Sequence, residues 1–307
     1  MAAIELAGVT KRYGDVTALH DLDLQVQSGE IYGFLGPNGA GKSTTIDILL
    51  DFVRPTSGTA EVLGYDAHED SLAIRQRIGV LPEGFHVYER LTARQHLQFA
   101  IESKDADDDP DALLERVGIP DAADRKAGGF SKGMQQRLAL AIALVGDPDL
   151  LILDEPSTGL DPNGAREMRD IITEEADRGA TVFFSSHILE QVEAVCDRVG
   201  ILQAGELVAE DTIRGLRDAA GTGSTLTVTV DELTPGVVEA VEDVPGVTSV
   251  DTDRDVLTVT TEGASKTDVL DAVEAAGGEV VDFATREASL DDVFAAYTND
   301  RDDEVSA

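Results

Sequence analysis

The segment Ile31-Tyr-Gly-Phe-Leu-Gly-Pro-Asn-Gly-Ala-Gly-Lys-Ser43 joins an apolar run to a glycine-rich loop. The residues from Gly36 to Ser43 match the pattern G-x-x-x-x-G-K-[ST]. The apolar run Ile31 to Leu35 predicts a buried strand before the loop, and the spacing from Ser43 to about Val53 predicts a helix after it. A strand, this loop and a helix in that order indicate a phosphate loop, in which backbone amides and a helix N-terminus hold an anion.

Each part of this loop has an expected role toward a nucleotide. We expect Lys42 to reach the β- and γ-phosphate oxygens and Ser43 to ligate Mg²⁺. The remaining nucleotide-binding candidates surround the phosphates, mainly through their backbone: Gly36, Pro37, Asn38, Gly39, Ala40, Gly41 and Thr44.

A second apolar run ends in two acids. Leu150-Leu-Ile-Leu153 predicts another buried strand, and Asp154 and Glu155 follow it directly. Phosphate-loop enzymes use an acid at this position for Mg²⁺, so Asp154 is a candidate metal ligand. Glu155 is placed to accept the proton of a water molecule that attacks the γ-phosphate.

A third motif points to a family. The segment Phe130-Ser-Lys-Gly-Met-Gln-Gln-Arg137 precedes a predicted helix, and its Ser131 lies 23 residues before Asp154. Taken alone, Ser131 could simply cap that helix and present its hydroxyl and amides to an anion. In combination with the other two motifs, the sequence resembles the ATP-binding subunit of an ABC transporter. The resemblance implies that Ser131, Gly133 and Gln135 contact ATP.

Three further residues extend this resemblance. Asp161 in Ser157-Thr-Gly-Leu-Asp161 resembles the aspartate of the D-loop, and His187 resembles the switch histidine that contacts the γ-phosphate. Tyr13 resembles the aromatic residue that stacks on adenine. Taken singly, Tyr13 is more often a packing residue and His187 an ordinary loop histidine, so their roles depend on the family resemblance.

One position departs from the common family pattern. Glu83 follows Val80-Leu-Pro82, where the family usually has glutamine. The sequence is therefore similar to the branch with Leu-Pro-Glu at this position. Its members pair with ABC-2-type membrane subunits and mostly export drugs, antibiotics, lipids or polysaccharides. Glu83 can still reach Mg²⁺ or the attacking water through an oxygen, and the tail Ala288-Ser-Leu-Asp-Asp-Val-Phe294 resembles tails of the same branch.

The order of predicted elements gives the domain organisation. Strands alternating with helices predict an α/β fold. The resemblance implies that residues 1–216 form a P-loop ABC ATPase core. This core should contain an antiparallel β subdomain and a helical subdomain at about 84–147. Residues 217–223 are predicted to be a linker. Residues 224–307 show a β-α-β-β-α-β order, which predicts a small ferredoxin-like α+β domain with an accessory or regulatory role.

The formal charge of −36 restricts the partners of the chain. So few basic residues disfavour nucleic acid and direct insertion into anionic lipid. With six lysines and many acidic blocks, the composition favours a halophilic protein over an ordinary acidic one. The longest apolar run, Leu138 to Val145, is too short to span a bilayer. The single cysteine, Cys196, cannot form an internal disulfide, which fits a reducing cytosol. Together with the family resemblance, this leads us to expect a peripheral protein on the cytoplasmic side of the membrane, held there by a permease subunit.

The resemblance implies a mechanism. Two copies should close head to tail around two ATP molecules, with Lys42 of one copy facing Ser131 and Gly133 of the other. The region from Phe85 to Tyr88 should then pass this motion to an ABC-2-type permease, most simply an exporter. An importer subunit and a soluble regulatory ABC-type ATPase stay open as alternatives.

Other ATPase classes fit the sequence less well. A DNA-repair ATPase would need a coiled-coil insertion for which the 89 residues between Lys42 and Ser131 leave no room. A translation factor of this superfamily usually carries two ATPase units in one chain. A GTPase would need an N-K-x-D sequence, which this chain lacks.

Overall fold

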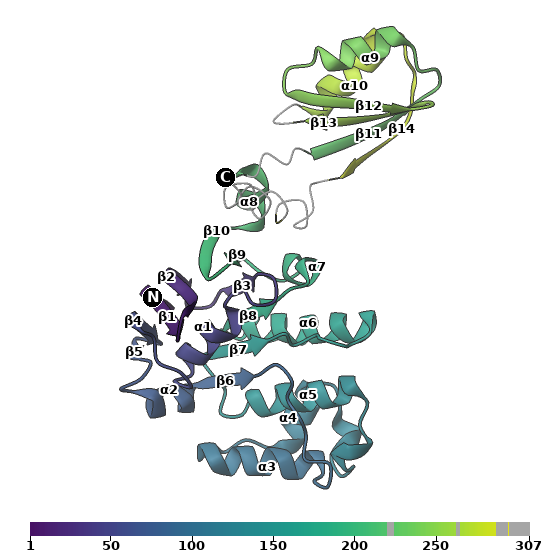
Figure 1. Ribbon diagram of the computed structural model, residues 1–307. Helices are drawn as coiled ribbons and strands as arrows, with labels where there is room; N and C mark the ends of the chain where they lie inside the picture. Colours follow the sequence, from purple (N-terminus) through teal and green to yellow (C-terminus); the bar gives the residue numbers. More distant parts are fainter. Residues whose placement is uncertain (220–223, 262–264, 287–293, 295–307) are drawn as a thin grey trace. The chain divides into compact units, whose positions relative to one another are not determined.

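The computed structural model describes residues 1–219, 224–261, 265–286 and 294, and Figure 1 shows the helices and strands within each of its parts. The chain divides into two compact units, Met1–Thr212 and Ile213–Ala307. Among the described residues, no helix combines the length and apolar character needed to cross a bilayer.

A six-stranded sheet forms the centre of the first unit, in the order β10-β9-β3-β8-β7-β6. Five strands run parallel and β10 is an antiparallel edge. Every residue of β3, β7 and β8 is buried, as expected for parallel strands covered on both faces. On one face, Tyr32, Ile152 and Phe183 share a core with side chains of the antiparallel sheet described below. The strand bounds are β3 (Ile31–Leu35), β6 (Ile78–Leu81), β7 (Leu150–Asp154), β8 (Thr181–Ser186), β9 (Arg198–Gln203) and β10 (Glu206–Asp211).

Aromatic packing and close helix approach hold this sheet. The rings of Tyr32 and Phe183 stack with centroids 5.9 Å apart, and Phe34 lies 5.2 Å from Phe183. At Gly79 of β6, a Cβ atom would lie 2.0 Å from the carbonyl oxygen of Ala143. Only glycine therefore lets β6 approach α5 (Lys132–Ala143) so closely. The helices of the core are α1 (Lys42–Leu49), α6 (Pro162–Asp177) and α7 (Leu189–Glu193).

An antiparallel sheet in the order β2-β1-β4-β5 forms the predicted β subdomain. Along β2 the core positions Leu22, Leu24 and Val26 alternate with exposed polar residues, as expected for a sheet with one buried face. Short elements here were not predicted, because β5 has two residues and α2 buries only Ile74. The bounds are β1 (Ala2–Tyr13), β2 (Val16–Gln27), β4 (Ser57–Val62), β5 (Tyr65–Asp66) and α2 (Ser71–Arg77).

The predicted helical subdomain is confirmed (Figure 1). It contains α3 (Ala93–Lys104), α4 (Pro110–Arg116), α5 (Lys132–Ala143) and the short turns η1 (Pro120–Ala122) and η2 (Ala127–Gly129). Two partly buried cations tie it to the core. Lys104 Nζ donates to the carbonyl oxygens of Ile78 and Val145, both at 2.8 Å, and Arg116 of α4 pairs with the buried Glu175 of α6.

The second unit contains the predicted β-α-β-β-α-β order. Its sheet, β12-β13-β11-β14, is antiparallel throughout. Valine and leucine side chains of β11 and β13 pack with valines of α9 and α10 in a separate core. This confirms the ferredoxin-like prediction. The bounds are α8 (Ile213–Ala219), β11 (Ser224–Val230), α9 (Pro235–Glu242), β12 (Val247–Asp253), β13 (Val256–Thr261), α10 (Lys266–Ala275) and β14 (Val280–Arg286).

The predicted boundary between the units differs from the observed one. The linker was placed at 217–223, but residues 217–219 belong to α8, which begins at Ile213 and groups with the second unit. Nothing before Gly221 in this stretch breaks a helix, so the helix continues past Leu216. Residues 220–223, and the Ala288–Phe294 tail apart from Phe294 itself, lie outside the described residues.

Candidate active site

Three strand ends meet at one edge of the central sheet. β3 leads into the loop Gly36–Gly41 and α1, β7 ends at Asp154, and His187 follows β8. Because β8 lies between β3 and β7 in a parallel sheet, the carboxyl ends of all three strands are neighbours. This edge is where open α/β sheets bind ligands.

The glycine-rich loop packs tightly against neighbouring backbone and side chains. Gly41 has a φ of 115°, and a Cβ atom there would lie 2.9 Å from the carbonyl oxygen of Ala18. Lys42 Nζ donates to the carbonyl oxygens of Gly36, at 2.6 Å, and Pro37, at 3.4 Å. Burial lowers the pKa of Lys42, and the nearby carboxylates oppose that shift. The ammonium group is therefore held across its own loop by neutral carbonyl groups, which phosphate oxygens can replace.

The carboxylate of Asp154 is buried. Burial raises its pKa, while a hydrogen bond from the Ser185 hydroxyl opposes the shift, and the charges of Glu83 and Glu155 raise the pKa further. Ser185 lies opposite Asp154 in the β7–β8 register. At this edge of the sheet the three carboxylates of Glu83, Asp154 and Glu155 outnumber the one cation, Lys42. This excess of negative charge favours the binding of a divalent cation.

The donor set fits Mg²⁺ that arrives with a nucleotide. Among the described residues, no group of three or more His, Cys, Asp or Glu side chains is arranged to hold a metal alone. Mg²⁺ is usually bound by one or two carboxylates together with substrate phosphates. Asp154, the exposed Glu83 and the exposed hydroxyl of Ser43 supply oxygens of this kind.

Glu155 is held by several partners and is only 8% exposed. Its φ of 51° is unusual for a residue with a side chain, and such conformations concentrate at functional sites. Its amide donates to the carbonyl and hydroxyl oxygens of Ser185, each at 3.2 Å. One carboxylate oxygen lies 2.8 Å from Nδ1 of His187, and the other accepts from the Thr158 hydroxyl at 3.2 Å. The structure thus brings together Glu155 and His187.

A second group of predicted residues lies apart from the phosphate loop. Ser131 caps α5 by accepting from the amide of Met134 at 3.3 Å, and Asp161 caps α6 by accepting from the amide of Gly164 at 2.7 Å. Ser131, Gly133 and Asp161 line one hollow of about 670 Å³, formed by residues from 118–137 and 159–167. Gln135 lies in the first turns of α5, and its side-chain amide donates to the carbonyl oxygen of Phe130 at 3.2 Å. In the described chain the candidate residues therefore form two groups, not one pocket.

Two further predicted residues are exposed. Tyr13, at the end of β1, is 47% exposed, and Lys11 Nζ lies 4.8 Å from the centroid of its ring. A ring this exposed is available for stacking. Glu83 is exposed beyond β6 and is close enough to influence the pKa values of Lys42 and Asp154.

Sequence reasoning missed the residues that hold the acids in place. Ser185 and Thr158 bond to Asp154 and Glu155, and Ser157 donates to the side-chain oxygen of Gln191 at 2.7 Å. The one available signal for Ser185 was its place two residues before His187 at the end of a buried strand. Its partner could not be deduced without the strand register.

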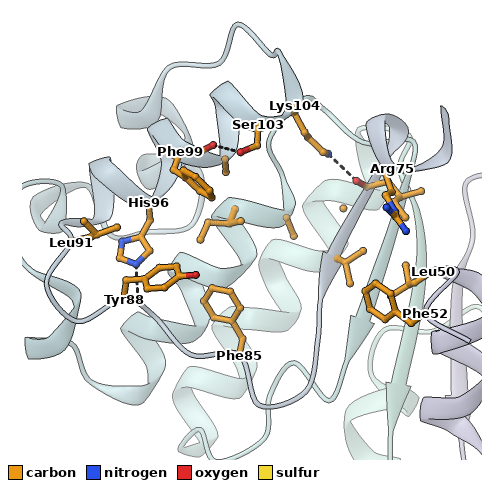
Figure 2. Close-up of a pocket in the computed structure, with 16 residues that line it drawn as sticks. Leu50, Phe52, Arg75, Phe85, Tyr88, Leu91, His96, Phe99, Ser103 and Lys104 are labelled. Atoms are coloured by element: carbon orange, nitrogen blue, oxygen red, sulfur yellow. Dashed lines mark hydrogen bonds between the residues drawn. The ribbon is translucent and has the colours of Figure 1, made fainter. Parts of the chain in front are cut away.

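A separate apolar groove of about 790 Å³ lies between the core and the helical subdomain (Figure 2). Three of its aromatic side chains are strongly exposed, namely Phe52 at 67%, Tyr88 at 69% and Phe99 at 67%. Phe85 and Tyr88 belong to the loop predicted to contact a permease. We call this surface the aromatic groove and define it by Leu50, Phe52, Phe85, Tyr88, His96 and Phe99.

Comparisons with known proteins agree with this fold and site. Residues 19–158 match the family described as ABC transporter, and residues 212–298 match the C-terminal domain described as ATP-binding protein DrrA1-3-like. The chain is 38% identical over 306 residues to the daunorubicin resistance ATP-binding protein DrrA3 of Streptomyces coeruleorubidus, covering 97% of this chain and 96% of that protein. It is 44% identical over 213 residues to the bacitracin transport ATP-binding protein BcrA of Bacillus licheniformis, covering 67% and 69%.

Solved structures show the same cassette. An ATP-binding subunit of an ABC transporter has a TM-score of 0.65 and 30% identity, covering 71% of this chain and 93% of that chain. An ATP-binding cassette solved as a post-hydrolysis dimer with ADP and Pi has a TM-score of 0.63 and 25% identity, covering 69% and 99%.

Fold and site define a phosphate-loop ATPase. The chain belongs to the ATP-binding subunits of ABC transporters, and its relatives place it with the drug and antibiotic resistance type.

Proposed function

We propose that two copies of this chain bind ATP head to tail and that its hydrolysis powers an ABC-2-type export permease. The observation that carries the proposal is the division of the site residues into two groups on one chain. Lys42 and Glu155 lie at the sheet edge, whereas Ser131 and Gly133 line another hollow. A second copy brings one group over the other, and a related cassette forms a dimer.

ATP binding would use the residues at the sheet edge. Lys42 would exchange its bonds to loop carbonyls for bonds to the β- and γ-phosphates, and the amides of residues 36–41 would surround the phosphates. Tyr13 would stack on adenine. Ser43, Asp154 and Glu83 would supply the oxygens that hold Mg²⁺, which neutralises charge between the β- and γ-phosphates.

Hydrolysis would depend on Glu155. Its carboxylate is fixed by Thr158 and His187 and by its own amide bonds to Ser185, so it can accept a proton from an attacking water without first being reoriented. His187 would contact the γ-phosphate while its Nδ1 stays on Glu155. The carboxylate can only accept a hydrogen bond, so Nδ1 must carry a proton.

The partner copy would complete each site. Ser131, Gly133 and Gln135 of that copy, at the N-terminal end of α5, would approach the γ-phosphate through backbone amides and a hydroxyl. Asp161 would contribute across the same interface. Loss of the γ-phosphate would remove the group that both copies bind, so the pair would reopen.

The aromatic groove supplies a surface for the permease. Three strongly exposed aromatic side chains around one concave apolar surface are typical of a protein-binding site. The acidic surface disfavours direct lipid contact, so the permease would hold the chain at the cytoplasmic side of the membrane. The relatives named for daunorubicin resistance and bacitracin transport favour an exporter over an importer, and so does a Nod factor export ATP-binding protein of Burkholderia lata that is 39% identical over 215 residues.

Affinity purification from detergent-solubilised membranes tests this proposal. The wild-type chain should recover an integral membrane subunit, and Tyr88→Asp and Phe99→Asp should recover at least several-fold less. Phe283→Asp, at another exposed phenylalanine (54%) in the second unit, is the control and should recover the wild-type amount. Recovery of no integral subunit by the wild-type chain, with ATPase activity intact, would favour a soluble regulatory ATPase.

A further inference from the structure

His96 lies in the wall of the aromatic groove and is only 4% exposed (Figure 2). Both of its ring nitrogens have partners. Nε2 lies 2.9 Å from the backbone nitrogen of Tyr88, and Nδ1 lies 2.8 Å from the carbonyl oxygen of Thr92. A buried histidine with both nitrogens in hydrogen bonds has a fixed ring orientation.

The chemistry of these partners determines where the proton lies. The amide of Tyr88 can only donate, so Nε2 must be the acceptor. The carbonyl of Thr92 can only accept, so Nδ1 must carry the proton. These two hydrogen bonds therefore fix His96 in the tautomer that carries its proton on Nδ1.

This hydrogen bond fixes the middle of the loop between β6 and α3. Beyond Tyr88, the loop is anchored by the amides of Ala127 and Gly128, which donate to the carbonyls of Leu91 and Glu89 at 2.9 and 3.1 Å. At Tyr88 the backbone amide is bonded inward while the side chain remains 69% exposed. The rings of Tyr88 and His96 also stack, with centroids 6.0 Å apart and their planes inclined by 28°.

We propose that His96 is a positioning residue for coupling to the permease. It holds the Tyr88 backbone so that the Tyr88 side chain lies at the edge of the aromatic groove in a binding-competent position. It has no role at the nucleotide, because its partners are in the loop and in α3. The loop part of this inference stands alone, and the coupling part rests on the proposed function.

Three substitutions at His96 separate positioning from simple packing. The oxygen of His96→Gln reaches about as far as Nε2 and can accept from Tyr88, whereas His96→Asn reaches only as far as Nδ1. His96→Leu accepts no hydrogen bond. His86→Gln, at an exposed histidine in the same loop, is the matched control.

Hydrogen exchange of the full-length chain measures the loop directly. We expect His96→Asn and His96→Leu to raise the exchange rate of the Tyr88 amide by about tenfold or more, with His96→Gln and His86→Gln close to wild type. Equal protection in every variant, or equal loss in His96→Gln and His96→Asn, overturns the inference.

Two further measurements make the result independent of folding and of the permease. In the wild-type chain at pH 8, nitrogen NMR of labelled histidine should show His96 with its proton on Nδ1, and a proton on Nε2 overturns the inference. Where wild type recovers an integral subunit, His96→Gln should recover a similar amount and His96→Asn several-fold less. Equal recovery by His96→Asn overturns the coupling role alone, and no recovery by wild type counts against the proposed function instead.

Discussion

At the scale of single residues, Glu155 and the groups around it hold the chemistry in place. The carboxylate is bonded at both oxygens and its backbone adopts a left-handed conformation, with a φ of 51°. Such a conformation costs about 1 kcal/mol for a residue with a side chain, so the surrounding bonds must maintain it. A residue held in this way is suited to one position and one role.

Glu155→Gln should remove the base and preserve the hydrogen bonds that position the side chain. We expect phosphate release to fall by about 100-fold or more, while ATP binding is retained. The uncleaved ATP should then hold two copies together, so gel filtration with ATP should show a dimer. Glu190→Gln, at an exposed acid of α7, is the control for loss of one charge. Wild-type turnover in Glu155→Gln would refute the base assignment.

Ser185→Ala tests the hydrogen bond that the Ser185 hydroxyl donates to Asp154, the proposed metal ligand. The Ser185 hydroxyl opposes the rise in the pKa of Asp154 that burial causes, so its removal should raise that pKa further. A higher pKa means that Asp154 takes up a proton at a higher pH. The acidic limb of the ATPase pH profile should therefore move toward neutral pH, and more Mg²⁺ should be needed for half-maximal rate. Ser28→Ala is the control, and an unchanged profile in Ser185→Ala would contradict the assignment.

At the scale of elements, an ion-pair cluster ties the helical subdomain to the core. Glu175 of α6 is 1% exposed and is paired with Arg116 of α4 and with Arg178, while Arg116 also contacts Asp147. Breaking a buried pair by removing one partner leaves a charge without full compensation. This cluster should therefore matter more to stability than the exposed pairs.

Arg116→Met should lower the free energy of unfolding by about 3 kcal/mol, at the low end for buried pairs because Arg178 remains on Glu175. Arg77→Met, which breaks the half-exposed pair with Asp149, should cost about 1 kcal/mol or less. Denaturant midpoints at one fixed salt concentration measure both. Equal shifts in the two variants would contradict the structural role of the cluster.

Elements with strong local patterns were predictable, and those defined by distant partners were not. The strand Ile31–Leu35 was predicted with the observed bounds, because a fully buried parallel strand is a continuous apolar run. β9, β10 and the short α7 were not predicted, since their burial depends on neighbours far along the chain. In the same way, the motifs predicted Glu155 and His187 as site residues. The hydrogen bond between Ser185 and Asp154 could not be predicted, because it depends on the β7–β8 register, which no motif contains.

At the scale of the whole molecule, the charge of −36 determines the salt concentration at which the protein is stable and does not determine its fold. This charge already counts every Lys and Arg, so the acidic side chains outnumber the basic ones by 36, and repulsion among the carboxylates should weaken the folded state at low salt. At about 1 M salt the screening length falls to about 3 Å, so this repulsion largely disappears. The same charge leaves the phosphate site usable, because Lys42 and the loop amides act locally.

Molar KCl should therefore raise the melting temperature and sustain or raise the ATPase rate. Thermal melts and phosphate release from low salt to molar KCl measure both. Sodium chloride at matched ionic strength separates screening from effects specific to potassium. Highest activity at low salt, with loss at molar KCl, would contradict the halophilic proposal without affecting the assignment of the site.

Mixing two inactive variants tests the shared-site account most directly. Lys42→Ala disables the phosphate loop, and Gly133→Asp places a negative charge where the partner's phosphates should lie, at a position with no atom closer than 3.8 Å to the added Cβ. A mixed head-to-tail pair contains one site with both lesions and one intact site. Each variant alone should be inactive, and an equal mixture should regain roughly a quarter of wild-type ATPase activity, since half of the pairs are mixed. A mixture no more active than its two components would contradict the account.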